Sequence, residues 1–74
     1  MSKFYTTECH KVGKKPMFVT CYTTKYGVMY QVFDNNREAC DFSRELGKKG
    51  YIYDYKWDIP IERIEQLKQI FNEK

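Results

Sequence analysis

An α+β fold, with a four-stranded sheet and two helices packed on one of its faces, is predicted by three observations. Stretches rich in aromatic and β-branched residues, separated by turn formers, fill the first half of the chain. Two later stretches repeat apolar residues with the 3.6-residue period of a helix, and one more strand-like stretch lies between them. The length of 74 residues suits one domain, residues 1–74. The expected order is therefore β-β-β-α-β-α.

Three strands are expected before the first helix. Residues 4–11 alternate loosely and predict an edge strand, which ends in a turn marked by glycine and proline. Residues 17–24 are rich in β-branched and aromatic side chains, and a tight turn leads from them into a return strand at 28–33. If these strands form a meander, the strand after the first helix runs parallel to the third, through a right-handed crossover.

The first helix has the clearest boundaries in the chain. Asn35 can cap its N-terminus, and Glu38 three residues later completes an approximate capping box. Either Gly47 or Gly50 supplies the left-handed residue that ends it. Its apolar face is expected to consist of Ala39, Phe42, Ser43 and Leu46.

A strongly alternating stretch and a second helix follow. Residues 51–57 place three tyrosines and a tryptophan on one face and mainly charged residues on the other, which predicts a strand. Asp58 is expected to cap the second helix, with Pro60 in its first turn. The apolar stripe of this helix is predicted to be Ile61, Ile64, Leu67, Ile70 and Phe71.

Composition indicates a cytoplasmic protein. The three cysteines are an odd number at irregular spacing, unlike a disulfide framework. The N-terminal residues lack the apolar core of a signal peptide, and no stretch approaches the roughly 20 apolar residues of a membrane span. The net charge of +3 and pI of 8.8 permit nucleic-acid binding without arguing for it, because dedicated domains usually exceed a pI of about 9.

The candidate chemical groups do not form a recognisable site. Structural zinc is usually held by two close pairs of ligands, whereas Cys9 and His10 are adjacent and Cys21 and Cys40 stand alone. Cysteine catalysis needs an imidazole beside the thiolate, and the single histidine belongs to or borders a lysine-rich turn. We therefore predict no catalytic residue, no metal and no cofactor, hence a protein that is not an enzyme.

The aromatic row at 51–57 has two interpretations. Tyr51, Tyr53, Tyr55 and Trp57 would stack on the bases of a single strand if they faced solvent. No lysine or arginine interrupts the row on that face, and the opposite face carries Asp54 and Lys56, which suit solvent. The row is therefore predicted to be the inner layer of the sheet.

Two surfaces are candidates for binding. With both helices on one face, the other face of the sheet is open, and it would present Tyr22 or Tyr30 to a partner protein or to a second copy in a homodimer. The first strand, with Phe4 and Tyr5, would offer an edge for strand addition. Scattered surface tyrosines without any function remain the alternative for the open face.

Lysine-rich turns provide an alternative site, for nucleic acid. The topology places three lysines at each end of the sheet, and each group would contact phosphates with strong salt dependence. Plain solvated turns are the competing interpretation. The two groups are Lys11, Lys14 and Lys15 at one end and Lys25, Lys48 and Lys49 at the other.

One long stretch resembles a known kind of protein. It reads VMYQVFDNNREACDFSRELGKKGYIYDY, in which a helix with the pattern E-A-x-x-F-x-x-x-L and a Gly-Lys-Lys-Gly turn lie between two aromatic strands. This order is similar to a module of small proteins from bacteriophages and mobile elements of Gram-positive bacteria, and it covers about 30 of the 74 residues. The resemblance implies an accessory protein that inhibits or redirects a host protein by binding it, and it assigns no functional residue.

Overall fold

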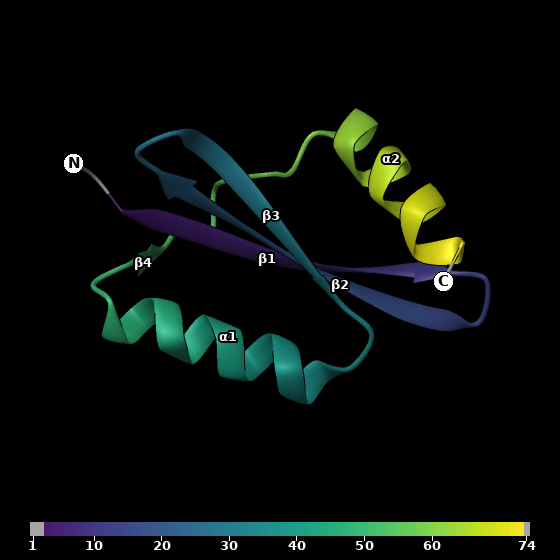
Figure 1. Cartoon of the computed structure of the whole chain (residues 1–74), viewed down its shortest axis with the longest axis horizontal. Helices are drawn as coiled ribbons and strands as arrows, with labels where there is room; N and C mark the ends of the chain where they lie inside the picture. The colour runs from purple at the N-terminus through teal and green to yellow at the C-terminus, as the bar shows by residue number, and fades with distance from the viewer. Residues whose placement is uncertain (1–2, 74) are drawn as a thin grey trace.

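The computed structural model describes residues 3–73 and confirms the predicted class and element order (Figure 1). The four strands form one sheet in the order β3-β2-β1-β4, in which β4 runs parallel to β1 and the other neighbours are antiparallel. The elements are β1 (Phe4–Val12), β2 (Lys15–Thr24), β3 (Gly27–Phe33), α1 (Asn36–Lys48), β4 (Ile52–Tyr53) and α2 (Ile61–Asn72).

The two helices lie on opposite faces of the sheet, so the prediction that they share one face is wrong. Odd-numbered residues of β2 (Met17, Val19 and Cys21) are fully buried in a cluster that includes residues of α2. The next residue, Tyr22, points to the other face, where its ring lies 5.5 Å from that of Phe42 in α1. Figure 1 shows the sheet between the helices. This arrangement is favourable because it removes the apolar side chains of β2 from water on both faces.

The helix α1 forms as the sequence predicts. The Asn35 side chain accepts a hydrogen bond from the Glu38 backbone N–H at 2.8 Å, which caps the N-terminus. Gly50, with a φ of +93°, takes the left-handed conformation after the C-terminus, and the Tyr51 N–H donates to the Leu46 carbonyl. Ala39 and Leu46 are buried against the sheet.

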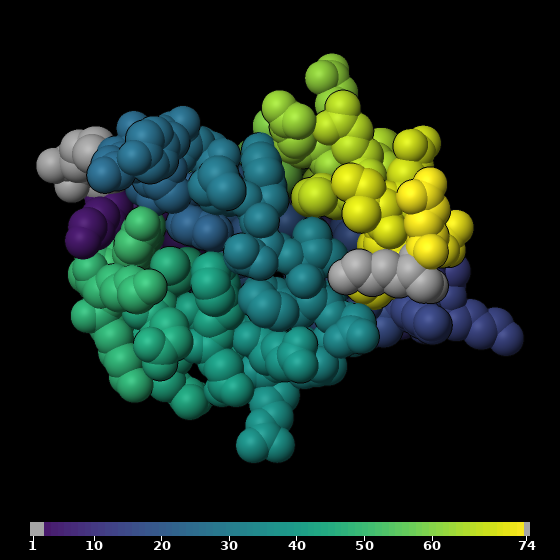
Figure 2. Space-filling model, viewed as in Figure 1, coloured from purple at the N-terminus to yellow at the C-terminus, as the bar shows by residue number. Residues whose placement is uncertain are grey.

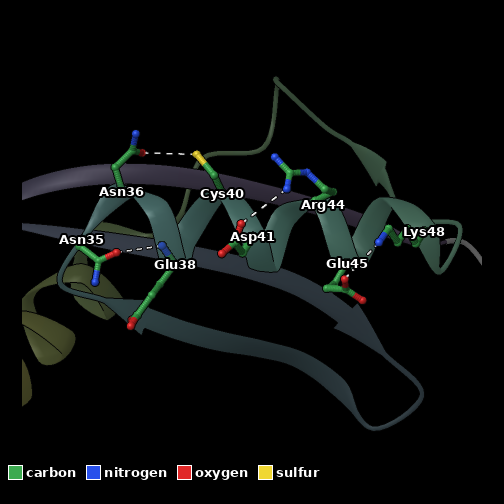
Figure 3. A network of polar contacts seen from close by, with 8 residues as sticks. All are labelled: Asn35, Asn36, Glu38, Cys40, Asp41, Arg44, Glu45 and Lys48. Atoms are coloured by element: carbon green, nitrogen blue, oxygen red, sulfur yellow. Dashed lines mark hydrogen bonds and ion pairs between the residues drawn. The ribbon is translucent and has the colours of Figure 1, made fainter.

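The outer face of α1 carries short-range polar contacts (Figure 3). Arg44 pairs with Asp41 at 3.6 Å and Lys48 pairs with Glu45 at 3.5 Å, both between residues three apart. Such exposed pairs contribute at most about 0.5 kcal/mol each, so the helix is held mainly by its buried face.

The strand predicted at 51–57 is two residues long. The Asp54 N–H makes a last bond to the Tyr5 carbonyl, and the Asp54 side chain then accepts from the Lys56 N–H, which turns the chain out of the sheet. The aromatic row is consequently divided. Tyr51 packs on Tyr22 beneath α1, and Trp57 packs against the core beneath α2. Tyr53 and Tyr55 are exposed, so the inner-layer prediction is wrong for these two.

The second helix begins later than predicted and buries fewer residues. Pro60 takes the capping position without a side-chain hydrogen bond, and Asp58 lies before it in the connection. Ile64 and Phe71 are buried, while Ile61 and Ile70 face solvent. The helix therefore rests on the sheet through a narrow stripe. Among residues 3–73, no helix has the length and apolar character needed to cross a membrane.

Candidate sheet-edge binding site

Both edges of the sheet are uncovered over part of their length. Strand β3 is the last strand on one side, and Figure 2 shows it at the surface between the two helices. On the other side, β4 pairs with β1 only at Phe4 and Tyr5. The rest of β1 therefore forms an edge, which we call the β1 edge and define as Thr7–Lys11. Within it, Cys9 and Lys11 are exposed.

Backbone groups of the β1 edge point away from the sheet. The carbonyl of Lys3 accepts a hydrogen bond from the Ile52 N–H of β4, and that of Tyr5 accepts one from the Asp54 N–H just after β4. Backbone groups in a strand alternate sides with a period of two residues, so Thr7, Cys9 and Lys11 present their N–H and C=O groups in the same direction. The even-numbered residues of β1 face β2 in the antiparallel register. No other described strand pairs with β1 beyond Tyr5, and the odd-numbered groups are free to meet an added strand.

A cleft of about 370 Å³ opens beside this edge on the side of α2. Glu8 makes two polar contacts within the lining of this cleft. One of its carboxylate oxygens accepts a hydrogen bond from the Ile59 N–H at 2.8 Å, and the other lies 2.7 Å from His10 Nε2. These bonds tie the connection between β4 and α2 to β1. The lining residues are Thr6, Thr7, Glu8, His10, Tyr53, Tyr55, Trp57, Asp58, Ile59, Ile61 and Ile64.

A second cleft, of about 280 Å³, opens on the side of α1. Tyr53 forms a wall of both clefts, and its ring meets that of Tyr5 edge to face at 5.4 Å. This cleft is lined by Tyr5, Thr7, Ala39, Cys40, Ser43 and Tyr53. The β1 edge therefore runs between two hollows, one on each face of the sheet.

Large apolar side chains are exposed around the same edge. Tyr55 is 77% exposed, Ile61 66% and Tyr53 45%, and all three line the cleft on the α2 side. Grouped exposed apolar residues of this kind are typical of interaction sites, whereas single ones need no explanation. We call the β1 edge together with Tyr53, Tyr55 and Ile61 the β1 edge surface.

Of the four residues predicted to bind a partner, Tyr5 lines the cleft on the α1 side, and the other three lie outside both clefts. Tyr22 is half-buried under α1, and Tyr30 is half-buried with Arg63 of α2 placed 5.9 Å from the centre of its ring. A helix therefore lies beside each tyrosine, α1 beside Tyr22 and α2 beside Tyr30, and neither tyrosine lies on an open face of the sheet. Phe4 and Tyr5 are also half-buried and pair with β4, so the edge begins two residues after them.

Three residues of the site were not predicted from the sequence. Tyr53 and Tyr55 were assigned to the core and Ile61 to the apolar stripe of α2. The signal that could have identified the two tyrosines is Asp54 between them, because aspartate favours a turn over the interior of a strand.

The six lysines of the nucleic-acid alternative remain in two groups at opposite ends of the sheet. Lys11, Lys14 and Lys15 lie on the β1–β2 hairpin and are exposed; the hairpin projects from the body in Figure 2. At the other end, Lys48 pairs with Glu45, and the Lys49 carbonyl accepts from Lys3 Nζ. The exposed lysines Lys25, Lys48 and Lys49 complete that group.

Metal-ligating side chains do not gather in the described part of the chain: no three of its His, Cys, Asp and Glu side chains are grouped so as to hold an ion.

The three cysteines differ in their surroundings. Cys9 and Cys40 are exposed, whereas Cys21 is buried. Burial raises the pKa of the Cys21 thiol from 9.0 to about 11, although a side-chain hydrogen bond with Tyr30 opposes the shift. Burial also raises the pKa of Tyr30.

The cysteines should differ sharply in reactivity. With iodoacetamide at pH 8, we expect Cys9 and Cys40 to be alkylated and Cys21 to resist, because the thiolate is the nucleophile and Cys21 is both buried and protonated. Mass spectrometry of tryptic peptides gives the extent at each position, and all three should react in 6 M guanidinium. Equal reaction of Cys21 in the native protein would contradict the packing of β2.

Comparison with protein-family models, curated proteins and solved structures finds no match to this chain.

Proposed function

We propose that the protein is a non-enzymatic, cytoplasmic protein-binding module that uses the β1 edge surface. The observation that carries this proposal is the coincidence of unpaired backbone groups in β1 with exposed Tyr53, Tyr55 and Ile61. Tyrosine is enriched in interface cores, and edge addition is a recurrent mode of protein recognition.

The biological role we propose is that of a phage-encoded accessory protein, an inhibitor or modulator that acts stoichiometrically on a host protein. The support is the resemblance of the stretch from Val28 to Tyr55 to small proteins of bacteriophages and mobile elements. A domain of 74 residues that binds a target directly suits such a role, because it needs no reaction centre of its own.

The alternative function is nucleic-acid binding through the lysine-rich ends. The observation that favours it is the projection of Lys14 and Lys15 from the β1–β2 hairpin, where both side chains are exposed. Such binding would fall steeply with salt, because each phosphate contact releases counterions. The two functions therefore respond differently to nuclease and to salt.

An affinity pull-down from bacterial lysate, with and without nuclease, tests the proposal. We expect the unaltered domain to capture a protein in stoichiometric amount, and nuclease treatment should not release it. The double variant Tyr55→Asp/Ile61→Asp should capture at least tenfold less of that protein. Both side chains are exposed, so the domain should stay folded. Buried interface aromatics commonly contribute about 2 kcal/mol or more, which is roughly 30-fold in affinity.

The matched control is Met29→Asp in β3, which is 48% exposed and lies on the opposite edge of the sheet. It should leave the captured protein unchanged. Equal loss with this control would move the site to β3. A captured species that disappears with nuclease would favour the lysine-rich ends instead.

A further inference from the structure

We propose that the β1 edge takes an extended peptide strand that pairs with the backbone of Thr7–Lys11 and places alternate side chains in the two clefts. This inference rests on the proposed function and specifies its partner: an unstructured or edge segment of another protein. The segment would extend the sheet by one strand, beyond the point where β4 leaves it.

The backbone of the edge is prepared for such pairing. The odd-numbered residues of this segment present their N–H and C=O groups outward, in continuation of Tyr5, whose carbonyl already accepts from Asp54. Cys9, at the middle of the segment, is exposed, and no described strand pairs with β1 there on the side away from β2. A five-residue partner segment would span roughly 17 Å at about 3.3 Å per residue.

The two clefts define the side chains of the partner. A strand directs successive side chains to opposite faces, so one set enters the cleft beside α1 and the other the cleft beside α2. The first is walled mainly by the apolar surface of Tyr5, Ala39 and Tyr53 and suits a branched aliphatic side chain. The second includes the exposed carboxylate of Asp58, which suits a basic side chain, whereas both oxygens of Glu8 are already held by the Ile59 N–H and by His10.

A second copy of the chain fits this edge less well. Antiparallel pairing centred on Cys9 would place Glu8 opposite His10 of the other copy, which is a favourable arrangement. The same register, however, places Gly13 of the second copy opposite Tyr5, a position that Tyr53 of β4 already occupies. A free peptide has no hairpin at that point and meets no such obstruction.

The test uses an acetylated and amidated heptapeptide in which valine alternates with lysine, added to the folded protein. Amide hydrogen exchange measured by NMR should slow at least tenfold at Cys9, with smaller slowing at Thr7 and Lys11. Exchange at Glu8 and His10 should not change, because their N–H groups already face β2. Fluorescence anisotropy of a labelled peptide should give at least tenfold weaker binding when glutamate replaces lysine.

A matched peptide isolates the role of the backbone. N-methylation at every second residue removes the donors that would face β1 while it keeps every side chain, and it should weaken binding at least tenfold. Unchanged affinity would overturn strand addition, and so would peptide binding without protection of Cys9. Equal binding of the glutamate peptide would overturn the basic preference.

Two further outcomes also overturn the inference. If the heptapeptide does not bind at millimolar concentration while Tyr55→Asp/Ile61→Asp still abolishes capture in the pull-down, the proposed function stands and its partner is not a strand of this kind. If sedimentation shows a dimer and Cys9 becomes protected without peptide as the protein concentration rises, the occupant is a second copy. If the unaltered protein neither captures a partner from lysate nor binds the peptide, the proposed function is wrong as well.

Discussion

Replacement of Ile64 by alanine is expected to cost about 2–5 kcal/mol of the free energy of unfolding. Ile64 is 1% exposed and belongs to the cluster that joins α2 to Met17 and Val19 of β2. A domain of this length has a total stability of roughly 4–11 kcal/mol, at about 0.05–0.15 kcal/mol per residue. The loss is therefore a large part of the whole, and the variant should be substantially unfolded at 37 °C.

Urea denaturation followed by circular dichroism measures this loss. The matched control is Ile61→Ala, which removes the same atoms one turn earlier on the same helix, where the side chain is 66% exposed. It should change stability by less than about 0.5 kcal/mol. Similar losses for both variants would mean that α2 does not rest on the sheet through Ile64.

The second large effect is expected for Phe42→Ala, at about 2–3 kcal/mol. Phe42 is half-buried, so the loss should fall below the roughly 3–5 kcal/mol of a fully enclosed phenylalanine. Its ring lies 5.5 Å from those of Tyr22 and Phe33, and both contacts would be lost. Denaturant titration with Arg44→Ala as the exposed control on the same helix measures the effect.

Combination of the two core variants tests the three-layer arrangement. Ile64 and Phe42 pack on opposite faces of the sheet, so their separate losses should add within about 0.5 kcal/mol. Because the sum approaches the total stability, the double variant is best measured in a stabilising osmolyte that is also applied to the single variants. A coupling energy well above that range would contradict separate cores.

The elements that sequence predicted well carry their own local signals. Asn35 and Gly50 are fixed by capping chemistry within a few residues, and β2 and β3 are joined by a tight turn. The face on which each helix packs has no such local signal. The apolar residues at both parities of β2 were compatible with one open face or with two covered faces, and only tertiary packing decides between them.

The position of the candidate site depends on the residue at which β4 ends. The alternation of aromatic and other residues at 51–57 predicts a longer strand and therefore a wrong end point. Three tyrosines and a tryptophan at a period of two predict a long strand, and the turn around Asp54 overrides that pattern after two paired residues. The exposure of Tyr55 and the edge at Thr7–Lys11 both follow from this early exit. The binding surface therefore could not be placed correctly while that strand was assigned seven residues.

The position of β3 at the outer side of the sheet has a consequence for colloidal behaviour. The segment GVMYQVF carries no charge and no proline, combines β-branched with aromatic residues, and exposes Val28 and Met29. Such segments on an edge are the usual nuclei of fibrillar aggregation. Lys25 before it and Asp34 after it are the nearest charges that can act as gatekeepers. We therefore expect these seven residues to limit the solubility of the protein at high concentration.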